Sequence, residues 1–246
     1  MPYRAGKTLP PPQRMHADPH MSSSARPARV GFVTIGQSPR DDIVPEIRDW
    51  VGLPFTAVER GALDGLSPDA IRALEPTGDE PRLVSRLRDG SEATLAAARV
   101  HARVSALLTE LDGQALDAIV LLCTGHFPPA ALQTPFVPAQ AVVDHGVTAL
   151  AAAVRTLGVL VPHEAQAREA ERRGWPLGEM RVVASHSTPY RDSRFAEAAR
   201  ELADADLIVM HCMGYDEAML ARVRAATRAP VLLARRLVAG ALRQLL

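Results

Sequence analysis

Short apolar runs alternate with helix-like segments from about residue 29 onward, and this alternation most narrows the folds open to the chain. The runs are rich in β-branched residues and apolar throughout, as strands buried on both faces of a parallel sheet are. Strands are predicted at residues 30–35, 55–58, 118–122, 157–161, 181–184, 207–211 and 231–233, with a weaker candidate at 82–87. Helices are predicted at 91–112, 164–173, 192–203 and 217–226, with Asp216 as the N-cap of the last. This pattern predicts an α/β fold with parallel sheets and right-handed crossovers.

Composition and charge exclude several classes of partner. Apolar residues make up 47% of the 246 residues and charged residues 23%, as in ordinary globular proteins. Lys plus Arg equals Asp plus Glu, 28 against 28, so no net charge attracts nucleic acid or anionic lipid. No apolar run approaches the roughly 20 residues that span a bilayer. We therefore expect a cytoplasmic protein with a small-molecule partner, and a homodimer is compatible with the sequence although no coiled-coil repeat supports one.

Residues 1–28 differ from the rest of the chain. They are rich in Pro, Arg, Ser and His, show no apolar periodicity, and lack the hydrophobic centre of a secretory signal. We predict a disordered N-terminal extension, and translation from Met1 or from Met21 fits the sequence equally.

The two cysteines of the chain stand in the same local setting. IVLLCTGHF contains Cys123 and LIVMHCMGYD contains Cys212, each after an apolar run and two residues before a glycine, Gly125 or Gly214. Ligands of parallel α/β sheets bind beyond the carboxyl ends of the strands, so both thiols should lie on one rim. A lone buried cysteine is usually only a small hydrophobic residue, but the repeated setting favours a functional pair.

Paired thiols suggest proton transfer. A thiol at the N-terminal end of a helix has a lowered pKa, and glycine lets backbone amides approach an anion closely. Thr124 and His211 flank the thiols with a hydroxyl and an imidazole. If the two loops face each other, one thiolate can remove a proton from a carbon acid while the opposite thiol returns a proton to the other face.

The first strand is followed by the loop GQSPRDD, which suits anion binding. Gly36, Gln37 and Ser38 can offer backbone and side-chain donors, and Arg40 can clamp a carboxylate with two hydrogen bonds. A structural alternative makes Ser38 a helix N-cap followed by Pro39 at the first helical position, and both roles can coexist. The loop is not a P-loop and no Gly-x-Gly-x-x-Gly follows a strand, so no cofactor is predicted.

Two other chemistries fit the sequence less well. Cys123, His126, His211 and Cys212 offer zinc-type ligands, but neighbouring residues at a strand end point in opposite directions, so no metal site is predicted. A Ser-His-Asp triad around Ser185 and His186 lacks the Gly-x-Ser-x-Gly elbow.

With these loops placed, the chain resembles the AroM family from about Arg29 to its C-terminus. The resemblance is carried by VGFVTIGQSPRDDIVPEI, IVLLCTGHFP, LGVLVPHEAQ, LIVMHCMGYDEAML and PVLLARRLVAGAL. More remotely it is similar to the aspartate/glutamate racemase superfamily, whose cofactor-independent racemases, maleate isomerases and decarboxylases have two similar α/β domains and a cysteine on each side of an interdomain cleft. This likeness implies that Cys123 and Cys212 are that pair, and that the Gly36–Arg40 loop with Thr124 holds a carboxylate.

The resemblance also implies the layout and the activity. Residues 29–140 with 229–246 would form the first domain and 141–228 the second. CTGHF and CMGYD replace the Asn/Thr-rich loops of the amino-acid racemases, so an α-amino acid substrate is not assumed. The leading hypothesis is a two-cysteine racemase or isomerase of a small carboxylate- or imide-bearing carbon acid. The alternatives are a single-cysteine isomerase or decarboxylase, and a non-catalytic carboxylate-binding or regulatory module.

Overall fold

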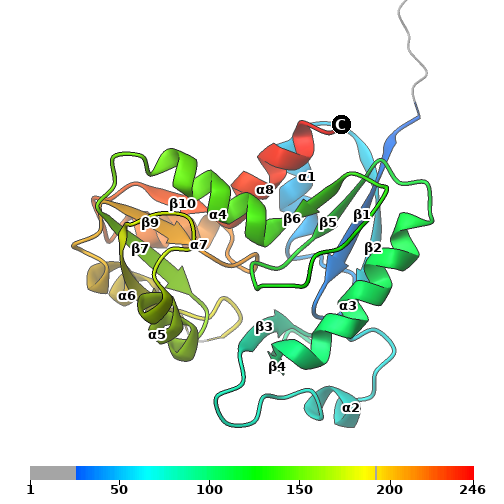
Figure 1. The fold of residues 1–246 in the computed structure, drawn as a ribbon, viewed down its shortest axis with the longest axis horizontal. Coiled ribbons are helices and arrows are strands. Elements are labelled where there is room, and N and C mark those ends of the chain that lie inside the picture. Colours follow the sequence, from blue (N-terminus) through cyan, green and yellow to red (C-terminus); the bar gives the residue numbers. More distant parts are fainter. Residues whose placement is uncertain (1–25, 192) are drawn as a thin grey trace, which may run out of the picture.

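A computed structural model describes residues 26–191 and 193–246, which form two parallel sheets side by side with helices around them (Figure 1). The predicted extension at residues 1–28 lies outside this part except for its last three residues, of which Ala28 opens the first strand. In the described residues, no helix is long and apolar enough to cross a membrane.

The elements follow one another in this order: β1 Ala28–Thr34, α1 Val44–Val51, β2 Phe55–Gly61, α2 Pro68–Arg72, β3 Arg82–Arg86, β4 Glu92–Ala96, α3 Ala97–Asp112, β5 Ala118–Leu121, β6 Phe136–Pro138, α4 Ala139–Leu150, β7 Thr156–Val161, α5 Glu164–Arg173, β8 Arg181–His186, α6 Phe195–Glu201, β9 Leu207–Met210, α7 Glu217–Arg224, β10 Val231–Leu233 and α8 Ala234–Arg243.

The two parallel sheets share one topology. The first has the order β2-β1-β5-β6 and the second β10-β9-β7-β8. If the strands of each sheet are numbered in chain order, the first sheet reads 2-1-3-4 and the second reads the same order in reverse. All strand pairs within these two sheets are parallel. The predicted fold class, two similar α/β domains with parallel sheets, is therefore confirmed.

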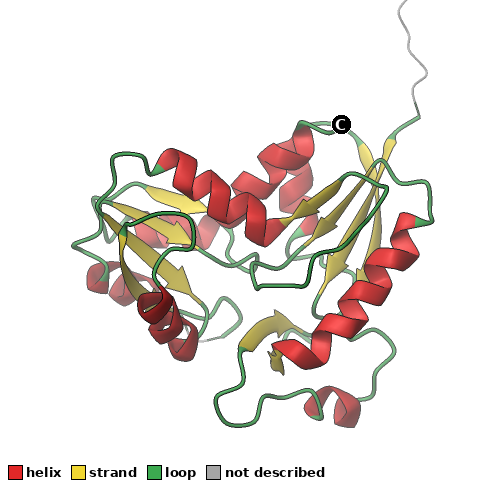
Figure 2. Cartoon of the chain, in the orientation of Figure 1, coloured by secondary structure: helices red, strands yellow, loops and turns green. Residues whose placement is uncertain are grey.

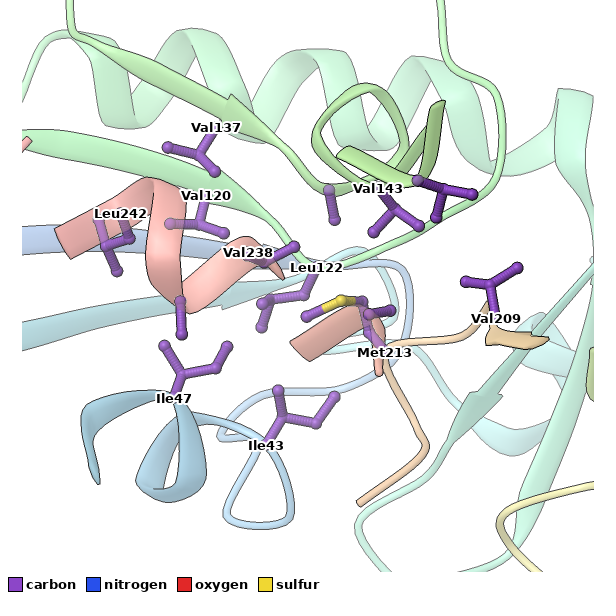
Figure 3. Close-up of a cluster of buried hydrophobic side chains, with 14 of the residues drawn as sticks. Ile43, Ile47, Val120, Leu122, Val137, Val143, Val209, Met213, Val238 and Leu242 are labelled. Carbon is purple, nitrogen blue, oxygen red and sulfur yellow. The ribbon is translucent and has the colours of Figure 1, made fainter. Parts of the chain in front are cut away.

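One apolar core joins the two sheets. It collects side chains from β1 and β5 of the first sheet, β7 and β9 of the second, and α1, α4 and α8. Figure 3 shows Val120 and Leu122 of the first half facing the same cluster as Val209 and Met213 of the second. Each sheet has a further core on its other face, under α3 and the β3–β4 hairpin or under α6 and α7. Both sheets are therefore covered on both faces, which explains their apolar runs (Figure 2).

The hairpin β3–β4 corrects the sequence prediction of one helix over residues 91–112. Residues 92–96 instead form a strand antiparallel to β3, and the helix begins at Ala97. Ala93 and Leu95 of this strand are buried in the outer core of the first half. This burial outweighs the helix propensity of an Ala- and Leu-rich segment. In Figure 1 the hairpin lies below the sheets.

The C-terminal segment 229–246 was expected to belong wholly to the first domain, and for its strand this is wrong. β10 pairs with β9 in the second sheet, because the edge of β9 away from β7 is open to it. Helix α8 then packs on α1 and α4. The predicted boundary near residue 140 stays a prediction, as α4 contributes to the core that both sheets share.

Candidate active site

The two cysteine loops are geometric copies of each other. Leu122, the residue before Cys123, donates its backbone N–H to Val33 O of the neighbouring strand at 2.8 Å. In the second half, His211 makes the equivalent bond to Leu160 O, also at 2.8 Å. Each chain then leaves its sheet, so the thiols stand just beyond the carboxyl ends of β5 and β9, the third strands of their sheets.

Each sulfur also receives a backbone hydrogen bond. Gly125 N–H donates to Cys123 Sγ and Gly214 N–H to Cys212 Sγ, both at 3.3 Å. Both cysteines are buried and free, with 8% and 9% of their surface exposed. The predicted approach of these amides to the thiols is thus present in the structure.

Both thiols line one cavity between the two halves, with a volume of about 40 Å³. Of the predicted site residues, seven lie around it: Arg40, Cys123, Thr124, Gly125, His211, Cys212 and Gly214. The remaining wall is mainly apolar and comes from both halves, with Leu83, Val84 and Pro162 among its members. The space is narrow, with room for a few water molecules.

The electrostatic prediction for the thiols was wrong. No helix follows Cys123, since the chain runs on as a loop to β6, and α7 begins only after its N-cap Asp216. Burial raises the pKa of Cys123 to about 12 and that of Cys212 to about 11, and the glycine N–H groups oppose this only in part. Desolvation of a thiolate outweighs the nearby positive charges.

Nearby charges act differently on the two thiols. Burial has the largest effect on the pKa of Cys212 and raises it. The Gly214 N–H lowers this pKa, and the charges of Arg40 and Arg235 lower it further. For Cys123, the negative charge of Cys212 adds to the effect of burial and raises the pKa further. The charge of one thiolate therefore disfavours a second thiolate in the same cavity.

The first loop is only partly in the cavity. Gly36, Gln37 and Ser38 are absent from its wall. Ser38 instead bonds to Asp64 through its hydroxyl at 2.5 Å and its amide at 2.9 Å, and Gln37 Oε1 accepts the Arg88 backbone N–H at 2.9 Å. The alternative role of Ser38 as an N-cap is wrong, because α1 begins at Val44.

Two predicted residues tie the halves together behind the thiols. Thr124 Oγ1 donates to His211 O at 3.1 Å across the two halves. The His211 imidazole points away from Cys212, with Nε2 2.9 Å from an oxygen of the buried Asp144 on α4. It also makes an edge contact with the Trp175 ring, with centroids 5.9 Å apart. His211 thus belongs to the support of the second loop.

Four polar side chains at or near the site were missed. Ser85 of the hairpin, Gln166 and Tyr190 line the cavity. Arg235, 1% exposed, lies beneath the Cys212 loop and donates to Met213 O at 2.7 Å and Gly214 O at 3.1 Å. Tyr190 stands in the loop after β8, Gln166 lies in the first turn of α5 directly after β7, and Arg235 shares the helical spacing of the apolar residues of α8, so the sequence carried a signal for these three.

The zinc alternative has little geometric support. His126 is exposed and does not line the cavity, and His211 is bound to Asp144. In the part of the chain that the structure describes, no three His, Cys, Asp or Glu side chains are grouped as metal ligands.

The family model for the AroM protein matches residues 30–246. The chain belongs to the AroM family. This AroM protein matches none of the curated proteins with which it was compared.

Solved structures share the fold of this AroM protein at low sequence identity. The maleate isomerase Iso from Pseudomonas putida S16 is 15% identical, with a TM-score of 0.53 over 88% of this chain and 92% of the other. Glutamate racemase from Francisella tularensis, in complex with D-glutamate, is 12% identical, with a TM-score of 0.55 over 89% and 80%. A mutant maleate cis-trans isomerase from Nocardia farcinica, with a covalently bound succinylcysteine intermediate, is 14% identical, with a TM-score of 0.52 over 89% and 92%. The chain therefore has the fold of the aspartate/glutamate racemase superfamily.

Proposed function

We propose that this protein is a cofactor-independent racemase or isomerase of a small carboxylate- or imide-bearing carbon acid, with Cys123 and Cys212 as the proton-transfer groups. The observation that supports this most is the equivalence of the two thiols. Each stands just beyond the third strand of its own sheet, accepts an N–H bond from a glycine two residues on, and lines the same cavity.

The positive charges near Cys212 support the assignment of roles, because Arg40 and Arg235 both lower the pKa of its thiol against the effect of burial. A Cys212 thiolate takes the proton from carbon, which leaves the electron pair on the substrate as an enolate and makes Cys212 a thiol. The Cys123 thiol then gives its proton to the opposite face of that carbon and becomes the thiolate. Each round of catalysis starts and ends with one thiol and one thiolate, and the mutual influence of the two charges disfavours a second thiolate.

The narrow cavity suggests a motion during turnover. Its volume of about 40 Å³ is small for a substrate, so we expect the halves to part to admit one. Contacts across the opening include Gln166 Nε2 to Arg82 O at 3.0 Å and the ion pair of Glu92 with Arg191 at 2.7 Å. In the opened site water lowers the pKa of the thiols, and closure then strips water from a thiolate and makes it a stronger base.

A second candidate is an isomerase or decarboxylase that uses one cysteine as nucleophile or acid. Arg40 and Arg235 both lower the pKa of Cys212 against the effect of burial, which favours this residue for such a role. The succinylcysteine in the Nocardia isomerase is an example of covalent chemistry at one thiol in a protein of this fold. A non-catalytic carboxylate-binding module remains the alternative from a different class.

Solvent deuterium exchange separates these functions. The wild type is incubated in deuterium oxide with amino acids, hydantoins and 2-substituted dicarboxylates, and loss of the Cα–H signal is followed by NMR. A two-cysteine racemase exchanges this proton, and Cys123→Ser or Cys212→Ser stops racemisation. If only Cys212→Ser abolishes activity, one cysteine carries the reaction. A protein that binds a carboxylate, exchanges no proton and tolerates both substitutions is a binding module.

A further inference from the structure

Arg40 already has a carboxylate partner within its own chain. It is 4% exposed, and its Nε and Nη2 donate to the two oxygens of Asp42, both at 2.8 Å. Nη1 donates to Thr34 Oγ1 at 2.9 Å. A guanidinium has five N–H groups, so three of them are bound to the first half and the positive charge is paired.

The other two N–H groups reach hydroxyls in the wall of the cavity. Nη1 lies 3.4 Å from Ser85 Oγ and Nη2 lies 3.2 Å from Tyr190 Oη. An oxygen that accepts a bond from arginine keeps its own O–H for another acceptor. Among the described residues, neither hydroxyl donates to a protein acceptor, so both O–H groups are available to a ligand in the cavity.

Close packing fixes both hydroxyls, and two glycines make this possible. A Cβ on Gly36 would collide with Ser85 Oγ, and a Cβ on Gly214 would lie 2.5 Å from Tyr190 Oη. Ser85 is thereby held on the hairpin of the first half, and Tyr190 against the Cys212 loop of the second. The hydroxyls come from opposite halves and meet at one guanidinium.

We infer that the Ser85 and Tyr190 hydroxyls, oriented by Arg40, are the donors that bind the substrate carboxylate, and that Arg40 is a positioning residue that does not touch the substrate. The inference rests on the proposed function only in taking this cavity as the substrate site. Loss of a proton beside a carboxylate moves negative charge onto its oxygens, and preorganised O–H donors stabilise that charge. The guanidinium behind them polarises both hydroxyls.

Malonate is a suitable probe, because its central carbon stands next to a carboxylate. Its binding is measured by isothermal titration calorimetry on the full chain. Ser85→Ala and Tyr190→Phe should each weaken binding about tenfold to hundredfold, as expected for loss of one hydrogen bond to a charged group. Ser85→Thr keeps a hydroxyl and should restore most of the affinity. Ser91→Ala, an exposed serine of the same hairpin, is the matched control and should bind as the wild type does.

Three results would overturn the inference: no binding of malonate by the wild type, wild-type affinity in both Ser85→Ala and Tyr190→Phe, or no recovery in Ser85→Thr. Circular dichroism of each variant shows that a loss of affinity is not a loss of fold. The Cys123→Ser/Cys212→Ser double variant separates this inference from the proposed function. It should still bind malonate while it exchanges no proton. A wild type that binds malonate through these hydroxyls but exchanges no substrate tested contradicts the proposed function and leaves the carboxylate subsite intact.

Discussion

Replacement of Arg235 by methionine tests how the second thiol loop is held. Arg235 on α8 joins three segments: it bonds to the carbonyls of Met213 and Gly214 and forms a 2.8 Å ion pair with Glu46 of α1. Methionine has a similar length but no charge and no donor. Arg235→Met therefore leaves two carbonyl oxygens without their donor and Glu46 without its counter-charge.

The expected loss of stability follows from these three contacts. Removal of one partner of a buried ion pair costs about 3–5 kcal/mol. The Glu46 side chain is 22% exposed, so water compensates part of its charge and the lower end, about 3 kcal/mol, applies. This is a large part of the roughly 5–15 kcal/mol by which a domain is stable.

Urea unfolding at neutral pH measures this change, with Glu46→Gln as the matched variant. Glutamine still accepts from Arg235, which keeps both carbonyls and the nearby charge of Asp42, so Glu46→Gln should cost less than Arg235→Met, about 1–2 kcal/mol. Burial raises the pKa of Cys212, and the charge of Arg235 lowers it in part. Without that charge a smaller fraction of Cys212 is thiolate, so its alkylation should be slower in Arg235→Met. A loss of stability in Arg235→Met no larger than that in Glu46→Gln would refute this account.

Two further predictions concern the thiols and the glycines. Burial raises the pKa of Cys123 to about 12 and of Cys212 to about 11, whereas unfolded thiols titrate near about 8.5. Above that pH the unfolded chain loses protons that the folded chain keeps, so the free energy of unfolding should fall, by up to about 2.7 kcal/mol per pH unit for both thiols. Denaturant unfolding from about pH 8 to about pH 10 checks this, and a Cys123→Ser/Cys212→Ser variant with the same slope would contradict it. Gly214→Ala should destabilise the protein by about 1–3 kcal/mol and displace Tyr190, because the new Cβ would lie 2.5 Å from the hydroxyl. Gly240→Ala, on the exposed side of α8 with no atom within 4 Å of its Cβ, should instead stabilise by about 1 kcal/mol, and similar melting temperatures for the two variants would argue against the packing described.

The main sheets were predictable because their strands carry their own signal. Ala118–Leu121 and Leu207–Met210 are apolar at every position, and strands of this kind have few alternatives to the centre of a covered parallel sheet. The position of both cysteines at one rim followed from this, since each stands directly after such a strand. Sequence pattern and structure agree here because local preference and burial point the same way.

The β3–β4 hairpin was harder, because its second strand has the composition of a helix. Glu92–Ala96 is rich in good helix formers, and only its pairing with Arg82–Arg86 and the burial of Leu95 make it a strand. Tertiary structure decides that β4 pairs with β3, and a short stretch of sequence does not contain this information.

The network around Arg40 was beyond the sequence for another reason. Ser85, Arg40 and Tyr190 are far apart in the chain, and no local pattern pairs them. The prediction of lowered thiol pKa values was also wrong because burial, a property of the tertiary structure, raises them. Whether a thiol is buried decides the direction of its shift, and the loops that bury these two come from both halves.

Helix α8 has a consequence for synthesis of the chain on the ribosome. It packs on α1, which is made almost two hundred residues earlier, and completes the core that both sheets share. Until α8 emerges, the apolar side of α1 lacks the part of its cover that α8 supplies, although the first sheet is already complete. We therefore expect nascent chains stalled before residue 234 to bind chaperones or aggregate, whereas chains that include α8 close this surface themselves.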